Sequence, residues 1–262
     1  MLNYSVLGEK ADIFLCHGIM GSGQNWRTFA RSLQEVRPEY GIALIDLRNH
    51  GRSPVGDAPH TIRACAEDLV VLEKELGVPK IVIGHSFGGK VALEYAHLRT
   101  SKQLWMLDSP PGTLDEKPED QSEVIKVITA LRAVPTPLEK RKDLVDFLMV
   151  QGFSRAISNW MTTNLKRGPD GYEFRFSLPV IEELLKDYFQ YDGWQVLEKN
   201  NANTDMHVVY AQNSDRWTDD SRARLLALSD VGVGVHCLPR AGHWVHVDNP
   251  TGLRNLLDRY LL

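Results

Sequence analysis

The stretch that most constrains the fold runs from Ile81 to Lys90, where Ile-Val-Ile leads directly into Gly-His-Ser-Phe-Gly-Gly-Lys. A helical spacing of apolar residues follows at once. This order predicts a buried strand, a sharp turn with Ser86 at its apex and a helix, the context in which a G-x-S-x-G sequence presents a nucleophile. Gly84 and Gly88 lack the Cβ atoms that would clash at such a turn. We therefore expect the Ser86 hydroxyl, in a strained backbone, at the carboxyl edge of a sheet.

Length and charge narrow the class of protein. The 262 residues suit one large domain, with or without an inserted piece, and 43% are hydrophobic. A net charge of −4 gives no electrostatic reason to bind nucleic acid or anionic lipid. No apolar run approaches the ~20 residues that span a bilayer. The three cysteines, Cys16, Cys65 and Cys237, form no disulfide framework and are expected to be buried, which suits a cytoplasmic protein.

Apolar runs alternate with helical patterns along most of the chain, which predicts an α/β fold with a mostly parallel sheet covered on both faces. A helix capped by Thr61 is expected before the nucleophile strand, and a last helix from Pro250. Residues 2–7 alternate weakly and precede a glycine turn, which indicates an edge hairpin. The other expected strands are Ile13–Cys16, Ile42–Ile45, Leu104–Leu107, His207–Ala211 and Val233–Leu238.

The pattern changes between about Pro110 and Trp194, where charged amphipathic helices are broken by proline and glycine. The segment Tyr172–Phe176 alternates, but no partner strand is evident. We interpret residues 110–194 as a mostly helical cap over the carboxyl edge of the sheet, inserted into an α/β core of residues 1–109 and 195–262.

A serine hydroxyl attacks at neutral pH only if a base takes its proton. Of nine histidines, His243 fits best, because it lies on the loop after the last strand and follows Ser86 in the chain. His246 is the second choice and is expected to stack or hydrogen-bond nearby. His85 is expected to point away from the serine. We interpret the following histidines as loop or packing residues without a catalytic role: His50, His60, His97, His207 and His236.

The base needs a carboxylate behind it, and two aspartates end strands at the correct edge. Asp108 follows the strand after the nucleophile helix, and Asp215 follows the first strand after the insertion. Spacing alone does not decide between them. An attacked carbonyl also needs two preorganised donors for its oxyanion. We expect these to be two backbone N–H groups. One belongs to Phe87, in the sharp turn around Ser86 (the elbow), and the other to Ile19, in the glycine-rich loop after the first buried strand.

The chain resembles the α/β-hydrolase superfamily over nearly its whole length. Within it, the stretches Asp46–Pro54, Gly84–Lys90 and Gly242–His246 resemble the YbfF-type bacterial esterases and their mitochondrial relatives, as does Phe174-Arg175-Phe176 followed by Pro179. In that family the catalytic acid is taken to follow the strand after the nucleophile. The resemblance therefore implies Asp108 rather than Asp215.

These residues predict a serine hydrolase that cleaves short- to medium-chain carboxylesters through Ser86, His243 and an acyl-enzyme. No metal or organic cofactor is expected. The expected partner is a small-molecule ester, without nucleic acid or a membrane span, and the chain is expected to be a monomer or homodimer. The alternatives are thioesterase, lactonase, C–C hydrolase or perhydrolase activity on the same triad, or a ligand-binding receptor with slow turnover.

Overall fold

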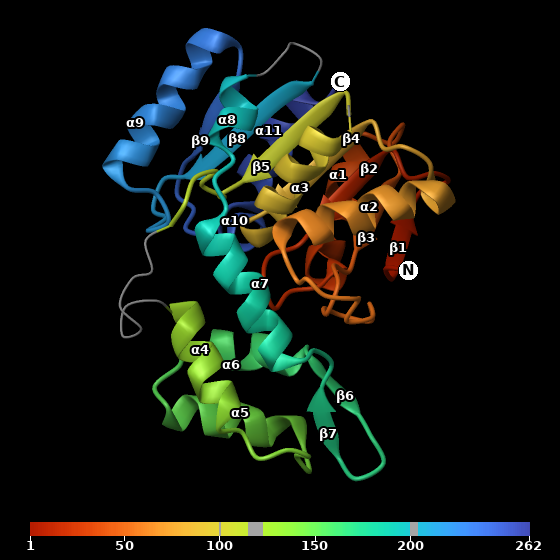
Figure 1. Cartoon of the computed structure of the whole chain (residues 1–262), viewed down its shortest axis with the longest axis vertical. Coiled ribbons are helices and arrows are strands. Elements are labelled where there is room, and N and C mark those ends of the chain that lie inside the picture. Colours follow the sequence, from red (N-terminus) through yellow and green to blue (C-terminus); the bar gives the residue numbers. More distant parts are fainter. Residues whose placement is uncertain (100, 115–122, 200–203) are drawn as a thin grey trace.

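A seven-stranded sheet forms the centre of the computed structural model, which describes residues 1–99, 101–114, 123–199 and 204–262 (Figure 1). The strand order is β1-β3-β2-β4-β5-β8-β9, and every neighbouring pair except β1 with β3 is parallel. This confirms the predicted α/β fold. The strands are β1 (Tyr4–Leu7), β2 (Ile13–Cys16), β3 (Ile42–Ile45), β4 (Ile81–His85), β5 (Gln103–Leu107), β8 (Asp205–Ala211) and β9 (Gly234–Leu238).

The first strand does not form the expected edge hairpin. Strand β1 pairs with β3 rather than β2, with Tyr4 opposite Ile45. In β2 all four residues are buried, and β2 already has β3 on one side and β4 on the other. The hairpin prediction was wrong because the parallel pairing of two fully buried strands outweighs the nearness of β1 and β2 in sequence.

Successive residues of the buried strands face opposite sides of the sheet. Ile13 and Leu15 belong to one apolar core, and Phe14 and Cys16 belong to the other. The two cores fix the sheet between two helical layers. The helices of the α/β part are η1 (Gly23–Trp26), α1 (Arg27–Val36), α2 (Ile62–Leu76), α3 (Phe87–Leu98), α8 (Trp194–Glu198), α9 (Asp219–Ala227), η2 (Leu228–Val231), α10 (Val245–Asp248) and α11 (Pro250–Tyr260).

Two details of this part test the sequence analysis. The Thr61 side chain accepts the N–H of Ala64, as expected of an N-cap. Cys16 and Cys65 are buried, but Cys237 is exposed, so the expectation of three buried thiols was wrong for it. Cys237 lies on β9, the edge strand of the sheet, which has a neighbour on one side only.

Between β5 and α8 the chain forms a separate group of elements, which we call the cap (Figure 1). Tyr172–Phe174 finds its partner strand in Leu165–Arg167, so the alternating segment is half of a small hairpin. The division at residues 110 and 194 stays a prediction, and residues 115–122 of the predicted cap lie outside the described residues. The cap elements are α4 (Glu123–Arg132), α5 (Arg141–Val150), α6 (Arg155–Thr162), β6 (Leu165–Arg167), β7 (Tyr172–Phe174) and α7 (Leu178–Gln190).

Hydrogen bonds from side chains of both parts fasten this cap to the core. Asn49 donates to the Ser177 carbonyl at 2.9 Å and accepts the Ser177 N–H at 2.8 Å, just before α7 begins. Asp187, on α7, accepts the N–H of Ile62 at 2.7 Å at the start of α2. In Figure 1, α7 runs from the remote part of the cap toward the sheet. The cap is therefore tied to the core at both ends of α7. Across the described ranges, no helix is both long and apolar enough to cross a membrane.

Candidate active site

Ser86 lies between the last residue of β4 and the first residue of α3, with φ +52° and ψ −119°. This backbone conformation is strained for a residue with a side chain. A Cβ on Gly84 would lie 2.0 Å from the Gly88 carbonyl oxygen, and one on Gly88 would lie 2.5 Å from the His17 carbonyl oxygen. Both glycines therefore allow the close approach of chains that the sequence predicted. The elbow presents the serine to the cavity under the cap.

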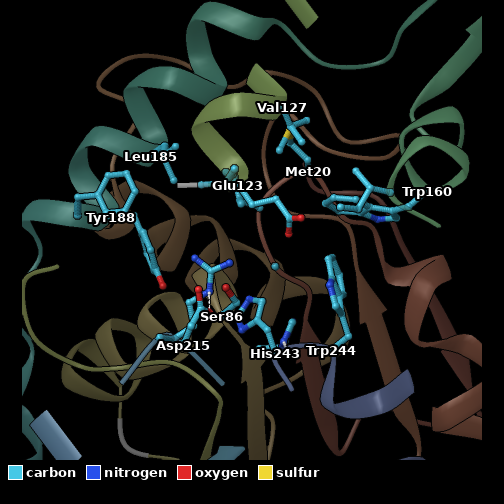
Figure 2. A pocket seen from close by; sticks show the side chains of 17 residues that line it. Met20, Ser86, Glu123, Val127, Trp160, Leu185, Tyr188, Asp215, His243 and Trp244 are labelled. Carbon is cyan, nitrogen blue, oxygen red and sulfur yellow. Dashed lines mark hydrogen bonds and ion pairs between the residues drawn. The ribbon is translucent and has the colours of Figure 1, made fainter. Parts of the chain in front are cut away.

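The imidazole of His243 opens into the same cavity, from the loop after β9 (Figure 2). Its Nδ1 lies 2.7 Å from Oδ2 of Asp108. Because Asp108 can only accept when ionised, this contact assigns the proton to Nδ1 and leaves Nε2 as the acceptor. An imidazole in this tautomer can take a proton from a serine hydroxyl.

Asp108 is fully buried at the end of β5 and accepts four hydrogen bonds. Oδ2 accepts from His243 and from the Ser214 hydroxyl at 2.6 Å, while Oδ1 accepts from the Ala211 N–H at 3.0 Å and from Trp217 Nε1 at 2.9 Å. Four donors hold the carboxylate in one orientation. Three of the four donors come from β8 and the segment that follows it, so the strand next to β5 supplies most of the contacts of Asp108.

Asp215, the alternative acid, has a different environment. Its side chain is 68% exposed and pairs with Arg216 at 3.4 Å. It reaches the rim of the catalytic cavity (Figure 2). The structure thus brings Asp108, not Asp215, to the imidazole. Ser214, the residue before Asp215, contributes to the site instead, because its hydroxyl donates a hydrogen bond to Asp108.

The two expected oxyanion donors flank the serine. Phe87 is the first residue of α3, so its N–H has no acceptor within the helix. Ile19 lines the cavity beside Ser86. The next amide along that loop is already used, because Met20 donates its N–H to His50 Nε2 at 2.9 Å. Among the described backbone groups none accepts the N–H of Ile19, so this amide can bind a ligand.

Two histidines hold this loop, His17 and His50, and of these the sequence analysis interpreted His50 as a loop or packing residue. His17 Nε2 accepts the N–H of Leu47 at 3.1 Å, and His50 Nδ1 donates to the Arg48 carbonyl at 2.8 Å. Burial, with His17 nearby, lowers the pKa of His50 to about 3. Burial also lowers the pKa of His17, against the attraction of Asp46. Both rings are therefore neutral, and each supplies the acceptor that its backbone partner needs.

Two more imidazoles, those of His85 and His246, lie near His243. His85 Nε2 donates to the backbone carbonyl of His243 at 2.8 Å, so it points away from the serine, as expected, and holds the base loop. His246 stacks on Trp26 with ring centres 4.0 Å apart, as the sequence suggested. Burial, with the positive form of His243 adding to it, lowers the pKa of His85 far below its ordinary value and that of His246 to about 4. Both rings are therefore uncharged at neutral pH.

The cavity above Ser86 has a volume of about 350 Å³. Its cap side is mainly apolar, and Figure 2 shows Trp160, Val127 and Leu185 across it from the serine. Glu123, from the first turn of α4, is its acidic group on that side. A volume near the lower end of the range for small-molecule sites suits a compact, largely apolar ligand.

Tyr188, on α7, lines the catalytic cavity from the cap side (Figure 2), and its phenol lies within hydrogen-bonding reach of Ser86. Burial raises the pKa of this phenol to about 12, opposed by Arg216 and by Ser86, so it remains a donor at neutral pH. Sequence reasoning missed Tyr188, because nothing in the helical spacing of α7 distinguishes it from a packing residue.

Lys90, in the elbow sequence, holds Tyr188 in place. Its ammonium is completely buried and donates to the carbonyl oxygens of Gly112 at 2.7 Å, Tyr188 at 2.7 Å and Tyr191 at 3.1 Å. It also lies 4.5 Å from the centre of the Tyr188 ring. Because Gly112 precedes the cap elements and Tyr191 follows α7, one side chain joins both ends of the cap to the nucleophile helix.

Among the described residues, no group of three or more His, Cys, Asp and Glu side chains is arranged to hold a metal ion.

Comparison with known proteins places this chain in a family. The sequence profile of the alpha/beta hydrolase family matches residues 13–256. Esterase YbfF of Escherichia coli is 28% identical over 256 residues, covering 97% of this chain and 94% of that protein. The sn-1-specific diacylglycerol lipase ABHD11 of Danio rerio is 28% identical over 263 residues, covering 95% and 78%. A solved marine microorganism esterase superposes with a TM-score of 0.85 at 26% identity, covering 99% of both chains.

Proposed function

The chain belongs to the alpha/beta hydrolase family and is a hydrolase of ester bonds, and from this premise we propose that it cleaves short- to medium-chain carboxylesters with Ser86, His243 and Asp108. The observation that carries the proposal is the bond from His243 Nδ1 to the buried Asp108 carboxylate, beside a serine at a strained elbow.

In the first half of the reaction, Ser86 Oγ attacks the ester carbonyl while His243 Nε2 takes its proton. The charge that forms on the carbonyl oxygen is stabilised by the N–H groups of Phe87 and Ile19. Asp108 stabilises the imidazolium without taking the proton itself. His243 then gives the proton to the leaving alcohol, and an acyl group remains on Ser86.

In the second half, water enters in place of the alcohol and His243 removes its proton. The hydroxide attacks the acyl carbonyl, and the same two amides stabilise the second oxyanion. Collapse of this intermediate releases the acid and returns the proton to Ser86. Acid–base catalysis of this kind contributes about 10²- to 10⁴-fold, and each oxyanion donor a further factor of about 10² to 10³.

The substrate assignment rests on the cavity. Its cap side is apolar, and its volume is about 350 Å³. Such a space favours a compact apolar acyl group, because each methylene removed from water contributes about 0.8 kcal/mol. Glu123 lies on the same side of the cavity. It disfavours esters whose acyl group carries a negative charge, since like charges repel.

The experiment that tests the proposal is steady-state hydrolysis of p-nitrophenyl esters with acyl chains of two to sixteen carbons. We expect the highest kcat/KM for a short or medium chain, and loss of activity in Ser86→Ala with the fold retained by circular dichroism. Thioesters and lactones assayed alongside test the alternative reactions. Substantial activity in Ser86→Ala contradicts the nucleophile assignment, and a preference for the longest chain contradicts the substrate assignment.

A further inference from the structure

A second cavity, of about 400 Å³, lies where the cap meets the core, and it shares no lining residue with the cavity above Ser86. Three arginines line it. Arg27 begins α1, Arg52 belongs to the Asp46–Pro54 stretch, and Arg175 follows β7 in the cap. The catalytic geometry makes no use of the side chains of Arg52 and Arg175, although both lie in stretches that the sequence analysis singled out. Their meeting at one cavity is the observation to be explained.

The three guanidinium groups have no partner among the described residues. In the part of the chain that the structure describes, none of the Arg27, Arg52 and Arg175 side chains makes a hydrogen bond or an ion pair. This differs from Arg48 nearby, which makes two bonds to Asp68, at 2.7 and 2.9 Å, and is nearly buried. The three arginines therefore face the cavity with their donors unused by the protein.

The acidic residue in the wall, Asp46, does not neutralise them. Its Oδ1 accepts the N–H of Gly23 at 2.8 Å, and its Oδ2 accepts from Asn3 Nδ2 at 2.8 Å and from the backbone N–H of Arg52 at 2.9 Å. Its carboxylate holds the turns together instead of pairing with a guanidinium. The wall thus carries three positive formal charges and one negative, in a chain whose net charge is −4.

Hydroxyl groups complete the polar wall. Ser22, in the loop that also carries Ile19, and Thr163, at the end of α6, both line the cavity. Guanidinium groups match tetrahedral oxyanions because each presents a planar fork of donors, and a phosphate monoester carries a charge of about −1.5 to −2 at neutral pH with three acceptor oxygens.

We propose that this cavity binds a phosphate group, as inorganic phosphate or a small phosphate monoester, between Arg175 of the cap and Arg27 and Arg52 of the core. A ligand held from both sides fastens the hairpin end of the cap to the core, next to the loop that carries an oxyanion donor. This site is separate from the catalytic cavity and does not depend on the proposed esterase activity.

Isothermal titration calorimetry with inorganic phosphate, at constant ionic strength, tests the proposal on the full chain. We expect saturable binding to the wild-type protein and affinity lower by about tenfold or more in Arg52→Gln and in Arg175→Gln, because each removes charge-assisted bonds. Circular dichroism of each variant shows that it is folded. Absence of saturable binding to the wild-type protein, or unchanged affinity in both folded variants, overturns the proposal.

Two matched variants locate the site. Arg31→Gln changes an exposed arginine one turn along α1 from Arg27, and Arg216→Gln changes the arginine of the catalytic cavity. Both are expected to bind phosphate as the wild type does. Loss of binding in Arg216→Gln would place the anion above Ser86 and refute the second site.

The source of the phosphate group is distinguished by two further ligands. Glycerol 3-phosphate is expected to bind competitively with inorganic phosphate. Vesicles containing phosphatidic acid are expected to bind no more strongly than neutral vesicles. Binding to the vesicles without binding of either free anion would contradict a small-anion site.

Discussion

Replacing Asp108 with asparagine tests the arrangement of the acid and the base. The carboxylate accepts four donors, two on each oxygen. Asparagine has the same shape but offers one acceptor oxygen and one donor NH₂ group. In either orientation, the NH₂ group replaces an oxygen that accepted two hydrogen bonds, so it cannot accept from those two groups.

The two orientations have different costs. If the NH₂ group faces His243, the imidazole loses its acceptor at Nδ1 and favours the tautomer with the proton on Nε2, which cannot accept the serine proton. If it faces Trp217 and Ala211 instead, two buried N–H groups are left unsatisfied, at about 1–3 kcal/mol each. The first orientation leaves the second pair satisfied, so we expect the variant to fold and to lose about 10⁴-fold in kcat, the size known for the equivalent change in a serine protease triad.

The assay compares kcat for p-nitrophenyl butyrate in Asp108→Asn and Asp215→Asn, with the free energy of unfolding from urea titration for each. The side chain of Asp215 is mostly exposed, and the carboxylate bonded to the imidazole is that of Asp108, so the Asp215 variant should change kcat less than about threefold. A larger loss of kcat in Asp215→Asn than in Asp108→Asn would refute the reasoning.

Three further changes test the supports of the site. Burial lowers the pKa of Lys90 to about 7 against the attraction of Asp192 and Asp187, below its unfolded value of 10.5, so the unfolded state holds more protons above pH 7. Stability should rise by roughly 1–2 kcal/mol between pH 7 and 8.5 in urea titrations of the wild type, and Lys90→Met should lack this rise. Tyr188→Phe keeps the ring but removes the phenol at Ser86, so kcat/KM should fall about tenfold with the unfolding free energy little changed; an unchanged rate argues against a role for this phenol. Asn49→Gly is compatible with the φ of +59° at this position but removes both hydrogen bonds to Ser177. It should lower the free energy of unfolding by about 1–3 kcal/mol in the same urea assay. An unchanged free energy of unfolding would mean that those bonds contribute nothing.

The elbow could be predicted from sequence because its determinants are local. The strand, the serine and the glycines lie within ten residues, and each glycine has a steric reason that can be stated without coordinates. The same is true of the Thr61 cap. Patterns of this kind depend on spacing along the chain, and the structure confirms them.

The surroundings of the acid could not be predicted in this way. Asp108 and Asp215 both follow a strand at the same sheet edge, and what separates them is contact with Ser214 and Trp217, 106 and 109 residues away from Asp108. Those contacts depend on β8 lying beside β5, and on how the turn after β8 folds. Sequence order places both aspartates at the edge but does not say which one is enclosed.

Contacts between the cap and the core were beyond prediction for a similar reason. Lys90 was visible in the elbow sequence, but its acceptors are backbone carbonyls up to 101 residues away. Any residue type can supply a carbonyl, so no sequence pattern marks these partners. Tyr188 was missed along with them.

Labelling with a fluorophosphonate tests most directly whether Ser86 is a nucleophile activated by His243. Mass spectrometry of the digested protein should find one adduct, on the peptide that contains Ser86, and the rate of labelling should fall by at least about 10³-fold in His243→Ala. An adduct on another residue, or equal rates with and without the imidazole, would contradict the account.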